Sequence, residues 1–203
     1  MIYTKSKAKD IITDKSKIKK TVSDTINRMA TIVGSTLGPG GNPVLIDRGD
    51  LAPLITKDGV TVAKSIGVAD AAANIVVDSC KEICINTAAE AGDGTTTAIV
   101  LANSIVTLGQ EFLTANPKYN PQRMINELQT AFKTVVTPYL KDVAISAETE
   151  EQLKYVATIS ANGDIEIANT VVEAVLAAGD DGTVLITEGQ GNVMSVDTDI
   201  TLP

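Results

Sequence analysis

The stretch that decides the fold runs from Ala91 to Ala102 and reads AGDGTTTAIVLA. It begins with two glycines around Asp93, continues with three threonines and ends in an apolar run. Glycine lets the backbone come close to a ligand, and N–H and hydroxyl groups at a helix N-terminus favour an anion. The stretch is therefore typical of a phosphate-binding loop at the start of an apolar helix.

Asp93 changes this interpretation, because a carboxylate beside a phosphate is repulsive. A divalent cation between the two groups removes the conflict, and Mg²⁺ commonly takes one or two carboxylates together with phosphate oxygens. These residues therefore predict a magnesium–nucleotide site. They also suit a simple pair of helix caps, since glycine often ends a helix and Asp or Thr often begins one. The local residues leave both readings open.

Helical periodicity dominates the rest of the chain. Apolar residues recur every three or four positions over 16–37, 71–91 and 121–144, and we expect Pro138 to kink or shorten the last of these helices. The segment 95–113 is apolar nearly all round, which is typical of a centrally buried helix. Two shorter helices are predicted over 148–160 and 164–178, with Gly179 as a C-cap.

Short strand patterns complete the fold class. Residues 44–47 and 54–56 flank a turn at 48–50 and predict a small β-hairpin. Residues 183–187 read TVLIT and predict a further strand near the C-terminal end. The chain is thus expected to be mainly α-helical with one hairpin, followed by a mixed α+β region.

Composition excludes several classes of protein. The 203 residues include no His and carry a net charge of −8, with 3% aromatic residues. The absence of His excludes a Ser-His-Asp triad and a His-ligated metal. Negative charge and few aromatics argue against binding to nucleic acid. No apolar run is expected to reach the ~18–20 residues of a membrane helix, and the N-terminus lacks the apolar region of a signal peptide, so neither a membrane segment nor export is expected.

The two cysteines, Cys80 and Cys84, are four residues apart and share one face of a helix. We expect them to be small buried core residues, because no pair of further metal ligands accompanies them. Two cysteines without an export signal fit a reducing cytoplasm.

Two more segments combine Gly, Thr and Asp or Lys: TLGPGG at 36–41 and TKDGV at 56–60. Taken alone, the first could be only a loop after a helix and the second only a turn. Neither a Walker A motif nor a Gly-x-Gly-x-x-Gly run is present, so the P-loop and Rossmann interpretations are not available.

Four motifs together carry a family resemblance. TLGPGG, ITKDGVTVAK, AGDGTTTAIVLA and ATISANGD, in this order and spacing, closely resemble group I chaperonins, the bacterial GroEL type. The related group II family shares the GDGTT core but usually departs from TKDGVTVAK. The resemblance implies the outgoing half of a multihelical equatorial domain over 1–141. It further implies an α+β intermediate-domain segment over 142–191 and an incomplete start of the apical region over 192–203.

The resemblance also implies roles for individual residues. Asp58 matches the catalytic carboxylate that positions the attacking water, and Asp93 matches the Mg²⁺ ligand. A possible K⁺ would be held by Thr36, Lys57 and Thr96. Ile159, Ser160 and Ala161 match the hinge-side stretch where the intermediate domain meets the site. The full nucleotide-binding set comprises Thr36, Leu37, Gly38, Pro39, Lys57, Asp93, Gly94, Thr95, Thr96, Thr97, Ile159 and Ser160.

The implied function is that of an ATP-dependent chaperonin subunit using ATP, Mg²⁺ and K⁺. Its implied partners are further copies in a heptameric ring, together with non-native client proteins and a co-chaperonin that bind an apical domain absent here. Its implied location is the bacterial cytosol, or the host cytosol if a virus encodes it.

Departures from the family pattern favour a fragment or truncated form. Family subunits are much longer, and the second catalytic carboxylate of the family lies beyond these residues. In the first loop, Gly40 and Asn42 stand where the family usually has Lys and Arg. We therefore expect these residues alone to be weakly active or inactive. The alternative is a non-hydrolysing structural or oligomerisation module of chaperonin ancestry. An unrelated magnesium-dependent phosphotransferase is disfavoured because no second acidic cluster is recognisable.

Overall fold

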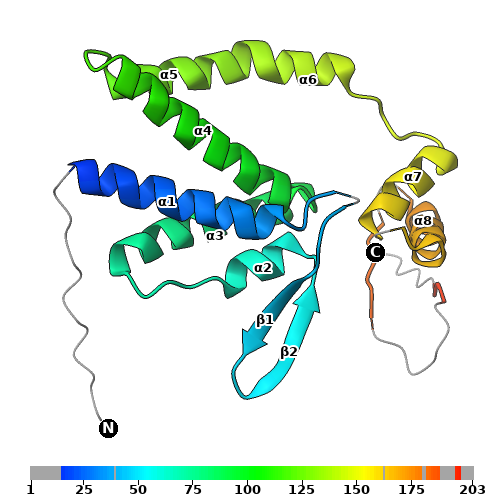
Figure 1. Cartoon of the computed structure of the whole chain (residues 1–203). Coiled ribbons are helices and arrows are strands. Elements are labelled where there is room, and N and C mark those ends of the chain that lie inside the picture. Colours follow the sequence, from blue (N-terminus) through cyan, green and yellow to red (C-terminus); the bar gives the residue numbers. More distant parts are fainter. Residues whose placement is uncertain (1–14, 39, 162, 180–181, 188–194, 198–203) are drawn as a thin grey trace, which may run out of the picture. The chain divides into compact units, whose positions relative to one another are not determined.

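The computed structural model describes residues 15–38, 40–161, 163–179, 182–187 and 195–197. The chain divides into two compact units, residues 1–126 and 127–203, and each is described by itself below. Both are built mainly from helices, as Figure 1 shows. The prediction of a mainly α-helical chain is confirmed.

The first unit is a helical layer with a hairpin. Helices α1, α3 and α4 pack against one another, and the short helix α2 packs against α3 (Figure 1). The elements are α1 (Lys15–Gly34), β1 (Val44–Arg48), β2 (Leu51–Thr56), α2 (Gly59–Ser65), α3 (Ala71–Ala91), α4 (Thr95–Ala115) and the start of α5 (Pro121–Ala131).

The core of this unit lies where α1, α2, α3 and α4 meet. Each helix contributes apolar side chains that are nearly inaccessible to solvent, and burying one such side chain contributes roughly 1.5–3 kcal/mol. The buried cluster comprises Ile26, Met29, Ala30, Val33, Val62, Ala63, Val77, Cys80, Cys84 and Ile99. The predicted periodicity of α1 and α3 therefore identified much of the core correctly.

Both cysteines are buried and free, as the sequence predicted. Burial raises the pKa of the Cys80 thiol to about 11, and the neighbouring Cys84 adds to the effect. Burial also raises the pKa of Cys84. Thiols with such pKa values stay protonated at neutral pH, so these side chains act as core residues.

Helix α1 ends three residues earlier than predicted. The hydroxyl of Ser35 donates to the carbonyl oxygen of Ile32, and that of Thr36 donates to Val33, each at 2.7 Å. These bonds satisfy carbonyl groups that a further helical turn would have used. Leu37 consequently lies outside the helix and is 48% exposed.

The burial predicted for α4 is wrong for the described residues. Only Thr95 and Ile99 of this helix are buried, because one side alone packs against α1 and α3. On another side, the side chains of Leu101, Ile105 and Leu108 are 56%, 59% and 64% exposed. Helix α4 therefore carries two apolar stripes, of which the described structure covers one.

Helix α4 differs from the expectation that no apolar segment reaches membrane length. Its 21 residues have a mean hydropathy of 1.3 over the best window, which suffices for a membrane span by length and composition alone. One such helix does not establish a membrane span, because the core helix of a soluble protein passes the same test of length and composition.

The predicted hairpin is confirmed. Strands β1 and β2 pair antiparallel, with Val44 opposite Thr56 and Leu45 opposite Ile55. Val44 and Ile46 pack against the core, whereas Leu45 and Ile55 are both 68% exposed. The side chains thus alternate between a covered and an uncovered face, as expected for a two-stranded sheet.

The second unit contains the end of α5, a π-helical turn η1 (Phe132–Val136), α6 (Thr137–Val143), α7 (Glu150–Ser160) and α8 (Ile165–Ala178). Pro138 does not end the helix that precedes it. The chain instead passes through η1, where the Thr137 N–H reaches back to the carbonyl of Phe132. A widened turn of this kind accommodates a proline that lacks an N–H group.

Helices α7 and α8 pack against each other and have well-formed caps. Thr149 and Gln152 form a capping box at the start of α7, and the Asp164 carboxylate caps α8. Gly179 ends α8 with φ 68°, as predicted. The strand predicted over 183–187 is absent, because a strand needs a partner for its backbone groups and the described residues supply none.

Candidate functional site

Three segments of the first unit, far apart in sequence, meet at one contact. The segment after α1 supplies Thr36, the start of α2 supplies Gly59, and the start of α4 supplies Thr96. The hydroxyl oxygens of Thr36 and Thr96 are 3.3 Å apart, although 60 positions separate them in sequence. Gly59 is buried beside them, and a Cβ atom there would overlap Thr96 Oγ1. The three Gly/Thr segments singled out in the sequence therefore form one site.

The start of α4 has the features of an anion site. Gly92 ends α3 with φ 75°, and Gly94 precedes α4 with φ 88°. Glycine adopts this left-handed backbone without a steric cost. Within the part of the chain that the structure describes, no side chain caps the first turn of α4. Its N–H groups, at the positive end of the helix dipole, are thus available to an anion.

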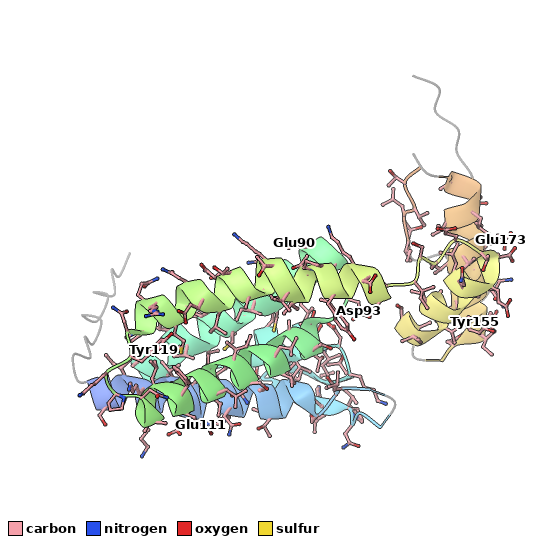
Figure 2. All side chains as sticks on the ribbon, turned by 90° about the horizontal axis from the view of Figure 1, so that it is seen from above. Glu90, Asp93, Glu111, Tyr119, Tyr155 and Glu173 are labelled. Carbon is pink, nitrogen blue, oxygen red and sulfur yellow. The ribbon has the colours of Figure 1, made fainter. Side chains whose placement is uncertain are left out.

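Asp93 lies in the loop between α3 and α4, at the same end of α4 (Figure 2). Its side chain is exposed, and Oδ1 accepts a hydrogen bond of 2.6 Å from the Gly94 N–H. Among the described residues, no group of three or more acidic or Cys side chains could hold a metal ion by itself. A single carboxylate fits Mg²⁺ that arrives with phosphate oxygens as further ligands.

The first loop closes tightly on itself after α1. The Gly41 N–H donates to the Gly38 carbonyl at 3.0 Å, and the Asn42 N–H donates to the Ser35 carbonyl at 2.8 Å. Gly38 has φ 74°, and a Cβ atom on Gly41 would overlap the carbonyl group of Thr36. This closure fixes the backbone beside Thr36. Pro39, also predicted to belong to the site, lies outside the described residues.

Asp58 is the N-cap of α2. Its carboxylate accepts hydrogen bonds from the Val60 N–H at 3.2 Å, from the Thr61 N–H at 2.9 Å and from the Thr61 hydroxyl. Partial burial raises the pKa of this carboxyl, but these hydrogen bonds and the charge of Lys64 outweigh burial and leave the pKa below its ordinary value. Asp58 is therefore ionised and fixed in direction at neutral pH, which suits orienting a water molecule. Lys57 beside it is exposed.

Replacing Asp58 separates its capping role from its charge. We expect Asp58→Ala to lower the free energy of unfolding by about 1 kcal/mol, and Asp58→Asn to lower it much less, because Asn is also a good N-cap. Urea denaturation at pH 7 measures both. Equal stability of Asp58→Ala and the unmodified chain would show that the cap contributes nothing.

The lowered pKa of Asp58 predicts how the stability of the same variants depends on pH. Because the folded state lowers this pKa from 3.8, the stabilisation is complete above that value and is lost as the pH falls through the folded pKa. Repeating the urea titrations across this acid range should show a smaller acid-induced loss for Asp58→Asn than for the unmodified chain.

The remaining predicted residues divide between the units. Thr95 is buried at the start of α4, whereas Thr97 is exposed there. Ile159 and Ser160 end α7 in the second unit, with Ile159 77% exposed and Ala161 as the C-cap. The structure does not place this unit relative to the first, so the part of Ile159 and Ser160 in the site stays a prediction.

The sequence-based prediction missed two glycines and one helix. Gly41 and Gly59 were not among the predicted site residues, yet neither position has room for a Cβ atom. The sequence predicts no helix over 59–65, where the structure has α2. The available signal was Asp58 as an N-cap followed directly by a short apolar segment.

Comparisons with known proteins identify the family of this chain. Residues 29–198 match the sequence profile of the TCP-1/cpn60 chaperonin family. Among solved structures, the chain is similar to the chaperonin gp146 from the bacteriophage EL 2 (Pseudomonas aeruginosa), crystallised in the presence of ATP-BeFx. The two are 33% identical with a TM-score of 0.66, and the match covers 77% of this chain but only 27% of that chain. The chain therefore belongs to the TCP-1/cpn60 chaperonin family.

Proposed function

We propose that this chain is the nucleotide-binding part of an ATP-dependent chaperonin subunit of the group I type. The observation that carries the proposal is the uncapped start of α4 beside Asp93, in contact with the loop that holds Thr36. The related phage chaperonin was crystallised in the presence of ATP-BeFx, which supports nucleotide binding by this chain. The motif TKDGVTVAK favours group I.

Each element of the site has a role in this proposal. The first-turn N–H groups of α4 and the hydroxyl of Thr97 bind phosphate oxygens, and Asp93 holds Mg²⁺, which neutralises phosphate charge when bound. Asp58 orients the attacking water. Phosphoryl transfer depends mainly on such positioning and electrostatic stabilisation. Thr36, Lys57 and Thr96 are the residues proposed to hold K⁺.

The proposal extends to the whole subunit. Residues 1–141 belong to the equatorial domain, 142–191 to the intermediate domain and 192–203 to the start of the apical region. A heptameric ring, client proteins and a co-chaperonin are the proposed partners, reached largely through parts of the subunit outside these residues. The proposed location is the cytosol of a bacterium or of an infected host cell.

Titration of the ¹⁵N-labelled chain with Mg-ADP, followed by amide NMR, tests the nucleotide site. Because much of the binding shell lies outside this chain, we expect weak binding, with the largest shifts at Gly94, Thr95, Thr96 and Thr97. Asp93→Asn should reduce these shifts, whereas Asp50→Asn, in the exposed hairpin turn, should not. Shifts that are absent at these amides, or unchanged when EDTA removes Mg²⁺, would contradict the proposal.

A non-hydrolysing oligomerisation module is the second candidate. Two observations favour it: the first loop lacks the two cations usual in the family, and α4 exposes an apolar stripe that suits contact with further protein. Native mass spectrometry distinguishes the candidates. A ring-sized particle that forms without ATP hydrolysis favours the module.

A further inference from the structure

The direction of one hydroxyl proton follows from the contacts of Thr36. This residue is 8% exposed, and its Oγ1 lies 2.7 Å from the carbonyl oxygen of Val33. A carbonyl oxygen can only accept a hydrogen bond. The single hydroxyl proton of Thr36 is therefore directed at Val33, in the last turn of α1.

This assignment determines the role of Thr96 in the second contact. The Thr36 and Thr96 hydroxyl oxygens are 3.3 Å apart, and either could donate on distance alone. Because the Thr36 proton is already used, Thr36 Oγ1 can only accept. Thr96 must therefore donate, and the chain of hydroxyls runs from Thr96 through Thr36 to the Val33 carbonyl.

A Thr96 hydroxyl that donates to Thr36 retains only lone pairs for any other partner. It can accept from an N–H group or face a cation, but it cannot donate to a phosphate oxygen. Buried Gly59 closes the other side, because a Cβ atom there would overlap Thr96 Oγ1. The side chain of Thr96 is thus held between the loop after α1 and the start of α2.

We propose that Thr36 is a positioning residue that acts through Thr96. Its hydroxyl ties the first loop to the start of α4 and turns the Thr96 proton away from the nucleotide. Phosphate recognition is thereby left to the α4 N–H groups and Thr97, and Thr96 Oγ1 serves as an acceptor. The proposal rests on the proposed nucleotide site for its effect on binding, but the hydroxyl pair itself does not depend on nucleotide.

A double-mutant cycle tests the pair. Thr36→Val removes the acceptor and Thr96→Val the donor. Each leaves the first loop to be ordered when nucleotide binds, so each should weaken Mg-ADP binding by up to about fivefold, the equilibrium factor of one neutral hydrogen bond. The double variant should lose hardly more than either single variant. Thr36→Ser should recover most of the affinity lost in Thr36→Val. Amide NMR titration with Mg-ADP provides the affinities.

Thr31→Val is the matched control. Its hydroxyl makes the same kind of bond, to the Asn27 carbonyl at 2.8 Å, on the exposed side of α1, and its loss should leave the affinity unchanged. The proposal would be overturned if the two losses of Mg-ADP affinity multiply in the double variant, or if Thr36→Ser recovers none of the affinity. If the unmodified chain binds no Mg-ADP, the nucleotide function fails. The same double-mutant cycle, measured by urea unfolding, then tests the hydrogen bond between Thr36 and Thr96. Additive losses of stability in the double variant would overturn that hydrogen bond.

Discussion

Replacing Ile99 by alanine is expected to lower the free energy of unfolding of the first unit by about 3–4 kcal/mol. Ile99 has no exposed surface and belongs to the cluster formed by α1, α2, α3 and α4. Truncation removes apolar contacts and leaves a cavity that rigid helices fill only partly. Loss of this size is a large fraction of the stability of an ordinary domain.

Ile105→Ala provides the matched control for this variant. The same side chain on the same helix is 59% exposed at position 105, so its truncation should cost well under 1 kcal/mol. Amide hydrogen exchange of α1 and α3 measures both effects in the first unit separately from the second. Equal losses of unfolding free energy for the variants at positions 99 and 105 would mean that α4 packs by a different face.

Gly41→Ala is expected to abolish detectable Mg-nucleotide binding by the first unit. The added Cβ atom would overlap the carbonyl group of Thr36 and lie 3.1 Å from the Gly38 carbonyl oxygen. These are backbone atoms, so no side chain can rotate out of the way. The loop must open, and Thr36 then moves away from Thr96 and the start of α4.

Gly40→Ala is the control for the loop variant. A Cβ atom on Gly40 meets nothing within 4 Å, and its backbone does not require glycine. We therefore expect Gly40→Ala to bind Mg-ADP like the unmodified chain in the same NMR titration. If Gly41→Ala also keeps its binding, closure of this loop is not needed for the site.

Helix α4 shows why sequence periodicity and observed burial differ. No charged residue occurs between Asp93 and Glu111, so the prediction of a central helix followed from composition. Composition indicates that both faces avoid water but not which element covers each face. The described structure covers the face with Ile99 and leaves the face with Ile105 exposed.

The helix ends were predicted less well than the helices themselves. The apolar spacing of α1 continues to Leu37, yet the hydroxyl groups of Ser35 and Thr36 bind the last carbonyls and end the helix at Gly34. Similarly, the strand predicted over 183–187 has strand-forming residues but no partner among the described residues. Termini and strands depend on specific hydrogen-bond partners, which an apolar pattern does not specify.

The sequence by itself determined the helical class, the hairpin and the family, because these follow from local spacing and from motifs in a fixed order. It also predicts a phosphate-binding loop over residues 92–97. Only the tertiary structure decided that Thr36, Gly59 and Thr96 meet and that a Cβ atom on Gly59 would overlap Thr96 Oγ1. These features arise between segments far apart in the chain. Packing of α1, α3 and α4 around Ile99 brings those segments together, and no local pattern contains that information.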